Sequence, residues 1–460
     1  MAVPPVQKDQ VVELRIEALA YGGMGLARLD GYVVFVSDAL PGDRVRARIR
    51  KRKANHAQAT VEELIEPSPV RIPADCPLHG HCGGCVWQTL PYDEQLKVKE
   101  RHVAEALEHI GGQAGLPLEP IAPSPRVWRY RNKMEFAFGA EAEGGLILGF
   151  HLPGRFDRIF SVGACLIQPE PFDAALRAVE AWARRSGLAP YDPRSHRGIL
   201  RNLALRRSET DGRWLAILVT QTTEVGGRLE ELAGVLGAAD AGFRGLLWGF
   251  NDAVADVVRI EREAGRVGDL WLEEQIEDLR FRISPFSFFQ TNTLGAAALY
   301  RVAREFLDLS GRETVLDAYC GAGTIGIFCA GQAQRVFGVE IVTEAVWDAR
   351  ENASRNGLGN CVFIAAPLAQ GLRLAQEAAG RDINRVVIDP PRGGMDKRSL
   401  KGLLGLRAPV FVYISCNPAT LSRDVAAICE AGYRIARVKP IDLFPHTYHI
   451  ETVIRFDRVD

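Results

Sequence analysis

Hydrophobic and polar positions form two different patterns along the chain of 460 residues. Near the N-terminus, short alternating runs such as residues 11–16 and 32–36 are separated by glycine turns, which predicts a small β domain over residues 9–67. From residue 286 onward, apolar runs of strand length alternate with segments of helix length. The expected strands are residues 314–318, 335–339, 361–365, 385–388, 409–414, 434–442 and 452–456. This alternation is typical of an α/β domain with a doubly wound, largely parallel sheet of the Rossmann-like kind, over residues 286–460.

The middle of the chain has no such regularity. Residues 68–90 contain several prolines, glycines and cysteines and are expected to form a loop. Residues 91–285 predict a mixed α+β domain. Its expected helices are 94–109 and 171–186, and its expected strands include 133–138, 146–150 and 214–220.

Composition excludes several classes of protein. Hydrophobic residues make up 47% of the chain and the net charge is −1, both ordinary for a globular protein. No stretch approaches eighteen apolar residues, and the N-terminus lacks an apolar signal core, so a cytoplasmic protein is expected. Nine cysteines are too few, and an odd number, for a disulfide framework.

Positive charge is concentrated in the N-terminal β domain. Arg44, Arg46, Arg48 and Arg50 alternate with apolar residues, which places all four on one face of a strand, and residues 51–53 add three more cations. One interpretation is a solvated edge strand that resists aggregation. We favour the alternative, a footprint for a nucleic-acid backbone on a small barrel-like domain.

A glycine-rich turn follows the expected strand 314–318. The order is Asp317, then Gly321 and Gly323, and Glu340 ends the next strand at a spacing suited to ribose hydroxyls. A dehydrogenase fingerprint has a different order of glycines, so the turn favours S-adenosylmethionine (SAM), which carries no pyrophosphate. Tight packing of strand and helix without a ligand is the other interpretation.

Asp389 follows the expected strand 385–388 and is succeeded by two prolines and Arg392. The carboxyl ends of parallel strands meet at one edge of the sheet, so Asp389 is expected to lie near the SAM turn. Such an Asp-Pro-Pro element is frequent where SAM methyltransferases handle nucleobases or amides. A plain turn is the alternative.

Cys416 and Glu451 form the third candidate constellation. Cys416 comes directly after an apolar and aromatic run, and Glu451 opens the last expected strand. Carbon 5 of a pyrimidine accepts a methyl group only after a thiolate has added to carbon 6. The carbon 5 proton must then be removed by a base, so a cysteine, a glutamate and SAM make a complete reaction.

Three motifs together resemble the RNA uracil-C5 methyltransferases, which make 5-methyluridine. They are residues 389–394 (DPPRGG), 413–420 (YISCNPAT) and 441–451 (IDLFPHTYHIE), and residues 286–293 (FSFFQTNT) resemble the family's segment that opens the catalytic domain. The resemblance implies Cys416 as nucleophile and Glu451 as proton acceptor. It also implies a SAM site made by Gln290, Tyr319, Gly321, Gly323, Thr324, Glu340 and Asp389.

The sequence departs from the family at two positions of the SAM site. Residues 365–367 read Ala-Ala-Pro where family members often carry Asn or Asp, so no side-chain contact with adenine is expected there. Thr324 stands where asparagine is common.

The loop contains three cysteines within ten residues, Cys76, Cys82 and Cys85. A zinc knuckle with His79 or His81 is one interpretation, and three close cysteines with a distant fourth favour iron–sulfur ligation. Similar family members hold a 4Fe-4S cluster, and here the resemblance implies Cys165 as the fourth ligand. Because methyl transfer needs no electron, a structural role is expected, while a redox-sensing role stays open.

RNA is the expected partner. The N-terminal domain resembles the TRAM module, an OB-like RNA-binding barrel, and residues 126–133 interleave cations with aromatics, either to stack on unpaired bases or as a basic strand with structural aromatics. A target uracil in folded RNA must be flipped out to reach Cys416. The combination of TRAM domain and cluster favours 23S ribosomal RNA, with a transfer-RNA T-loop as the alternative, and a monomer is expected. Cytosine C5 methylation and a non-catalytic RNA-binding or assembly factor are the other interpretations.

Overall fold

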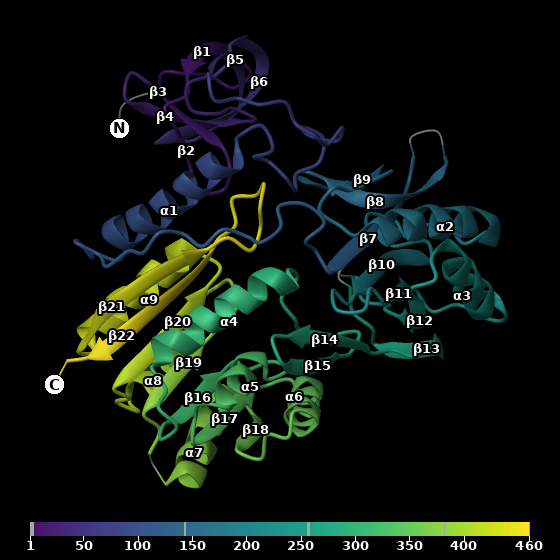
Figure 1. Ribbon diagram of the computed structural model, residues 1–460. Helices are drawn as coiled ribbons and strands as arrows, with labels where there is room; N and C mark the ends of the chain where they lie inside the picture. Colours follow the sequence, from purple (N-terminus) through teal and green to yellow (C-terminus); the bar gives the residue numbers. More distant parts are fainter. Residues whose placement is uncertain (1–3, 142–143, 255–257, 381, 460) are drawn as a thin grey trace. The chain divides into compact units, whose positions relative to one another are not determined.

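The computed structural model describes residues 4–141, 144–254, 258–380 and 382–459. The chain forms two compact units, each assembled from segments that are distant in sequence (Figure 1). The first unit comprises Met1–Ser124, Cys416–Ala426 and Lys439–Thr452, and the second comprises Pro125–Ser415, Ala427–Val438 and Val453–Asp460. Two short C-terminal segments therefore belong to the same unit as the N-terminal domain.

The N-terminal part of the first unit is a six-stranded, barrel-like sheet with the order β1-β5-β6-β4-β3-β2. The strands are β1 (Val11–Arg15), β2 (Ala18–Leu19), β3 (Gly25–Leu29), β4 (Tyr32–Ser37), β5 (Arg44–Arg52) and β6 (His56–Glu66). Alternate residues point inward and form one apolar core of valine, alanine, leucine and isoleucine. Because β5 lies between β1 and β6, the interpretation of this basic segment as an edge strand is wrong.

Helix α1 (Tyr92–His109) follows the cysteine-containing loop in the first unit. It begins after Pro91 with Asp93 and Glu94 in its first turn, where carboxylates interact favourably with the helix dipole. Val98 on its buried side packs in a small core with Trp87 and Leu90. This core fixes α1 beside the residues that precede it.

The central part of the second unit is a seven-stranded sheet with the order β13-β12-β11-β10-β7-β8-β9. Its strands are β7 (Lys133–Ala140), β8 (Leu146–Leu152), β9 (Arg155–Ser161), β10 (Leu200–Arg207), β11 (Trp214–Thr220), β12 (Phe243–Phe250) and β13 (Arg262–Gly268). Helices α2 (Glu170–Ser186) and α3 (Arg228–Ala239) pack on it through a core that includes Trp182, Trp214 and Trp248. A separate hairpin of β14 (Leu272–Ile276) and β15 (Leu279–Ile283) follows.

The C-terminal part is a second seven-stranded sheet, ordered β18-β17-β16-β19-β20-β22-β21. The strands are β16 (Thr314–Ala318), β17 (Arg335–Glu340), β18 (Cys361–Ala365), β19 (Arg385–Ile388), β20 (Val410–Ser415), β21 (Tyr433–Ile441) and β22 (Glu451–Arg458). The helices are α4 (Thr293–Leu307), α5 (Thr324–Ala330), α6 (Thr343–Arg355), α7 (Leu368–Ala379), α8 (Lys397–Leu404) and α9 (Pro418–Glu430). The first five strands in the order pair in parallel, which confirms the predicted Rossmann-like domain.

The strand order of this sheet reverses beside β16. The chain passes from β16 to β17 and β18 on one side and then returns to β19 and β20 on the other. The carboxyl end of the strands at such a switch point is where open α/β sheets bind ligands. None of the helices in the described residues is both long and apolar enough to cross a membrane.

Candidate active site

The turn after β16 stands at this switch point and has an unusual backbone. Tyr319, Gly321 and Gly323 all have positive φ angles, of 65°, 52° and 78°. A Cβ added to Gly321 would meet no atom within 4 Å, whereas a Cβ on Gly323 would lie 2.9 Å from Ala349 and from the ring of Phe363. Gly321 therefore leaves room for a ligand, while Gly323 is needed for close packing around α5.

The two glycines are expected to respond differently to substitution. Gly321→Ala should cost about 1 kcal/mol of stability, since alanine is strained at positive φ but meets no neighbour. Gly323→Ala adds overpacking to the same strain and should cost about 2–4 kcal/mol. Chemical denaturation of both variants measures the difference, and equal losses would contradict the packing role of Gly323.

Three carboxyl groups converge beneath this turn. Asp317 is fully buried in β16, and its Oδ2 accepts a hydrogen bond from the backbone N–H of Gly326 at 2.8 Å. Burial, together with the negative charges of Asp389 and Glu340, raises the pKa of Asp317 to about 8. Burial likewise raises the pKa of the half-buried Asp389 to about 7. Because a nearby cation lowers the pKa of a carboxyl group, Glu340 and Asp389 at this ligand edge favour a cationic ligand.

These raised values predict a pH-dependent stability. The folded chain keeps the Asp317 carboxyl protonated up to about pH 8, whereas the unfolded chain ionises it near 3.8, so stability from this group is lost as the pH rises between those values. Asp317→Asn removes that loss. The free energy of unfolding of this variant relative to wild type should therefore increase by about 4 kcal/mol from about pH 5 to about pH 9, and its relative melting temperature should increase with it. Asp278→Asn, at an exposed site, is the control. A difference that stays constant with pH would contradict the assignment.

Glu340 is held at the end of β17 by backbone groups. One carboxylate oxygen accepts from the N–H of Gly321 at 3.2 Å, and the other accepts from Ile341 and Val342 at 2.8 and 2.9 Å. The Ile341 side chain, directly after Glu340, is 67% exposed. An apolar side chain exposed at this edge is a feature that the sequence alone did not single out.

Gln290 and Thr324, both predicted to contact the cofactor, lie near the ends of helices in the second unit. Gln290 is buried before α4, and its backbone carbonyl accepts from Asn132 Nδ2 at 2.8 Å. Thr324 opens α5, and its hydroxyl lies 3.2 Å from that of Tyr300. The hydroxyl of Thr324 thus has a partner within the protein.

Cys416 and Glu451 stand at the ends of neighbouring strands. Cys416 is half-buried and follows Ser415, the last residue of β20, and Asn417 Oδ1 accepts from Ala419 N at the start of α9. Glu451 is the first residue of β22, the neighbour of β20, and is only 4% exposed. Both residues belong to the first compact unit. The thiol thus directly follows the end of β20, and the carboxylate stands at the start of the neighbouring strand β22.

Comparisons with known proteins match nearly the whole chain. A family model described as tRNA (Uracil-5-)-methyltransferase matches residues 268–459, and a TRAM domain model matches residues 5–61. A protein of Clostridium tetani named as an uncharacterized RNA methyltransferase is 38% identical over 458 residues, which is 99% of each chain. The chain belongs to the RNA uracil-5 methyltransferase family.

Two further matches agree with this family. A Gloeobacter violaceus protein, also named as an uncharacterized RNA methyltransferase, is 39% identical over 98% of this chain and 97% of its own. The solved tRNA (uracil-54, C5)-methyltransferase of Pyrococcus abyssi, in complex with S-adenosyl-L-homocysteine, is 27% identical with a TM-score of 0.77. It covers 96% of this chain and 99% of its own. The family expected from the three motifs is confirmed.

The basic face of strand β5 in the methyltransferase differs from expectation. The four arginines do share one face, but carboxylates from β1 and β6 pair with three of them. The ion pairs are Arg44 with Glu13 and Glu66, Arg46 with Glu63, and Arg48 with Glu62. Such exposed pairs are individually worth about 0–1 kcal/mol, so phosphates can compete for them. The face is nevertheless one of mixed charge and not a purely cationic one.

The basic and aromatic segment 126–133 of the methyltransferase has a structural role in part. Arg129 donates to the carbonyls of Cys165 and Gln168 at 2.7 and 2.8 Å and pairs with Asp173 at 3.3 Å. Tyr130 is only 4% exposed. For these two residues the interpretation as structural side chains holds.

Cys76, Cys82 and Cys85 all lie half-buried in the loop before α1 of the methyltransferase. The Gly84 N–H donates to Cys82 Sγ at 3.4 Å, and burial together with Cys76 raises the pKa of Cys82. Cys165 belongs to the second unit, where its N–H donates to Asp173. In the part of the chain that the structure describes, no three histidine, cysteine or acidic side chains form a group that could hold a metal ion.

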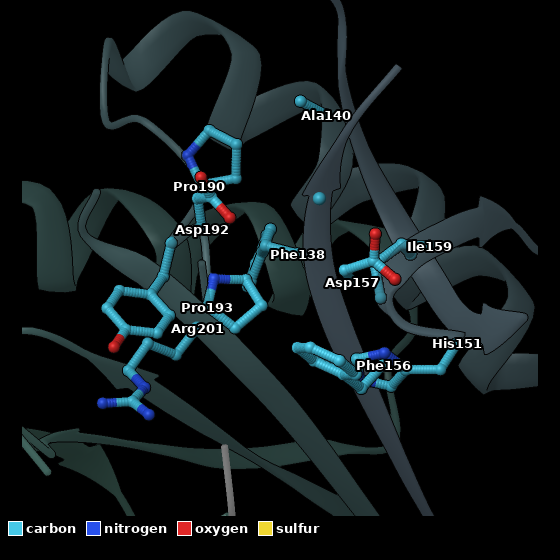
Figure 2. A pocket seen from close by; sticks show the side chains of 12 residues that line it. Phe138, Ala140, His151, Phe156, Asp157, Ile159, Pro190, Asp192, Pro193 and Arg201 are labelled. Atoms are coloured by element: carbon cyan, nitrogen blue, oxygen red, sulfur yellow. The ribbon is translucent and has the colours of Figure 1, made fainter. Parts of the chain in front are cut away.

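A separate pocket of about 170 Å³ lies in the central domain, between strands β7–β9 and the segment before β10 (Figure 2). Phe138, Phe156, Asp157 and Asp192 line it. Arg201 forms one wall and stacks on the Tyr191 ring at 4.3 Å. None of the residues predicted for catalysis or cofactor binding lines this pocket.

Proposed function

We propose that the protein methylates carbon 5 of a specific uridine in RNA, with SAM as the methyl donor. The observation that carries the proposal is the placement of Cys416 and Glu451 at the ends of adjacent strands and in one compact unit. Family membership supports the class of reaction, and the TRAM domain supports RNA as substrate. The proposal also expects a monomer acting in the cytoplasm.

Cys416 and Glu451 have complementary tasks in this reaction. The Cys416 thiolate forms a bond to carbon 6 of the flipped-out uracil, and the electron pair moves to carbon 5. SAM, when bound, supplies an electrophilic methyl group that carbon 5 takes up. Glu451 then removes the proton from carbon 5, the electron pair restores the double bond, and the carbon 6–sulfur bond breaks to release Cys416. The thiolate is regenerated and the carboxylate carries the proton away.

The SAM site of the proposal combines the carboxyl groups and the open turn. Glu340 and Asp389 favour the positively charged sulfonium and ammonium groups of SAM. The space at Gly321 admits the ligand close to the backbone. We assign the exposed Ile341 to the adenine, since residues 365–367 offer no polar side chain to that base. Gln290, Tyr319, Gly323 and Thr324 complete the proposed site.

Tritium release tests the function directly. RNA labelled with tritium at carbon 5 of uridine should lose label to water when wild-type enzyme and SAM are present, and RNA labelled at cytidine should not. Release from cytidine would indicate cytosine C5 methylation. RNA binding without any release would identify a non-catalytic binding factor and overturn the proposal.

Two classes of RNA are candidate substrates. We favour 23S ribosomal RNA, because the chain combines a TRAM domain with the cysteine loop. Transfer RNA is the second candidate, because the solved Pyrococcus abyssi enzyme that resembles the full chain is named for uracil-54 of transfer RNA. Mapping 5-methyluridine in both RNAs of a deletion strain distinguishes them.

We also propose that Cys76, Cys82, Cys85 and Cys165 hold a 4Fe-4S cluster with a structural role. The Gly84 N–H that points to Cys82 Sγ supports thiolate ligation in the loop. The protein purified without oxygen should contain iron and acid-labile sulfide, and Cys82→Ser should lose both. Zinc in place of iron would instead support the zinc-knuckle interpretation.

A further inference from the structure

Helix α1 buries polar side chains on the face that packs inside the first unit. Gln95 and Lys99 are fully buried, and His102 is only 5% exposed. Burying a lysine is costly unless its charge is paired and hydrogen-bonded. The partners of these side chains come from the C-terminal end of the chain.

Lys99 holds the start of the segment 442–450, which joins β21 to β22. Its Nζ lies 2.7 Å from Asp442 Oδ1 and donates to the Phe444 carbonyl at 3.0 Å, and the side chains of Lys99 and Asp442 are both completely buried. The Tyr92 hydroxyl, also on α1, donates to Asp442 Oδ2 at 2.8 Å. Asp442 Oδ1 additionally accepts from the Phe444 N–H at 2.9 Å. Both oxygens of Asp442 are thus used to fix the entry of the segment.

Gln95 holds the middle of the same segment. Its Oε1 accepts from the His446 N–H at 2.8 Å, and its Nε2 donates to the carbonyls of Trp87 and Leu90 at 3.1 and 2.8 Å. The His446 carbonyl in turn accepts from the Trp87 N–H at 3.0 Å. His446 has a φ angle of 65°, a left-handed conformation that a non-glycine residue adopts only when its surroundings fix it. Gln95 therefore stabilises a strained backbone five residues before Glu451.

The segment leads directly into Glu451, the first residue of β22. A buried ion pair such as Lys99–Asp442 is often no more stabilising than apolar side chains of similar size. The polar contacts instead hold the backbone of segment 442–450 in a single defined conformation. We propose that Gln95 and Lys99 are positioning residues for Glu451, holding segment 442–450 so that the carboxylate is directed at the carbon 5 proton. This inference rests on the proposed function of Glu451.

The proposal predicts a selective defect in one step of the reaction. Methyl transfer depends on Cys416 and SAM, whereas elimination depends on Glu451. In Lys99→Met and Gln95→Met, elimination should slow by about 10–100-fold, since a displacement of about 1 Å costs that much, while methyl transfer slows less. A methylated covalent RNA adduct should accumulate on denaturing gels in single-turnover reactions. Lys97→Met, on the exposed side of α1, is the matched control and should behave as wild type.

A second pair of variants keeps the test valid if one substitution unfolds the chain. Lys99→Met leaves the Asp442 carboxylate buried without its cation, so Lys99→Met combined with Asp442→Asn removes both charges. Adding Gln95→Met to Glu451→Gln should slow elimination no further, because both changes act on the same base. Equal slowing of both steps, or an additive effect on Glu451→Gln, would show a merely structural role and overturn the inference. Absence of tritium release from the wild type would instead overturn the proposed function itself.

Discussion

Cys416→Ala is expected to lower tritium release from uridine-labelled RNA by at least about 10⁴-fold, because no other group can activate carbon 5 in the proposed reaction. Removal of the thiol also removes the covalent bond to carbon 6, so no RNA adduct should survive denaturation. Affinity for RNA should change little. Gel analysis of denatured complexes, tritium release and a binding assay measure these three properties on one preparation.

Cys429→Ala is the matched control for this experiment. Cys429 lies in α9, is half-buried like Cys416, and has its pKa raised by burial, which makes it a poor nucleophile. This variant should retain both adduct and turnover. Tritium release by Cys416→Ala at the wild-type rate would exclude Cys416 as the nucleophile.

Glu451→Gln is expected to accumulate the covalent RNA adduct, whereas Cys416→Ala forms none. Glutamine keeps the size and polarity of the side chain but cannot accept the carbon 5 proton. Turnover should fall by about 10²–10⁴-fold, which is the usual contribution of a general base. The methylated RNA should remain bonded to Cys416 and migrate with the protein on a denaturing gel.

A second substitution at position 451 distinguishes the loss of the base from a folding defect at this buried position. Glu451→Asp retains a carboxylate on a shorter side chain and should recover part of the turnover with less adduct than Glu451→Gln. Glu430→Gln, at an exposed position of α9, should have no effect. A Glu451→Gln enzyme that turns over normally, or that never forms an adduct, would contradict the role of Glu451 as base.

The regular elements of the fold could be predicted from local sequence because each carries its own periodicity. Strands 214–220, 314–318, 361–365 and 385–388 have the bounds expected from the pattern of apolar residues. The glycine-rich turn after strand 314–318 was also predictable from the sequence. In the structure, Gly321 and Gly323 both adopt the positive φ angles that such a turn requires. The pattern could not show that these two glycines serve different purposes, which depends on what lies beside each Cβ position.

The departures arise from contacts between residues that are far apart in the sequence. The carboxylates that pair with the β5 arginines come from other strands, so the sequence around residues 44–53 shows only cations. Gln95 and Lys99 are polar residue types that usually lie on the exposed face of a helix. Their spacing places them on the same side of α1 as Val98, Val103 and Leu107, which is a local sign that these polar residues are buried.

The hydrogen bonds between α1 and segment 442–450 also constrain when the protein can become active. Gln95 and His446 are 351 residues apart, and Lys99 and Asp442 are 343 apart. During synthesis, α1 is made early, but Lys99 can pair with Asp442 only after almost the whole chain has been made. Contacts of such long sequence separation form late in folding, because the intervening chain must first be ordered. The segment before Glu451 would therefore be among the last parts to assemble, and an incomplete chain could expose a thiol without a base to complete the reaction.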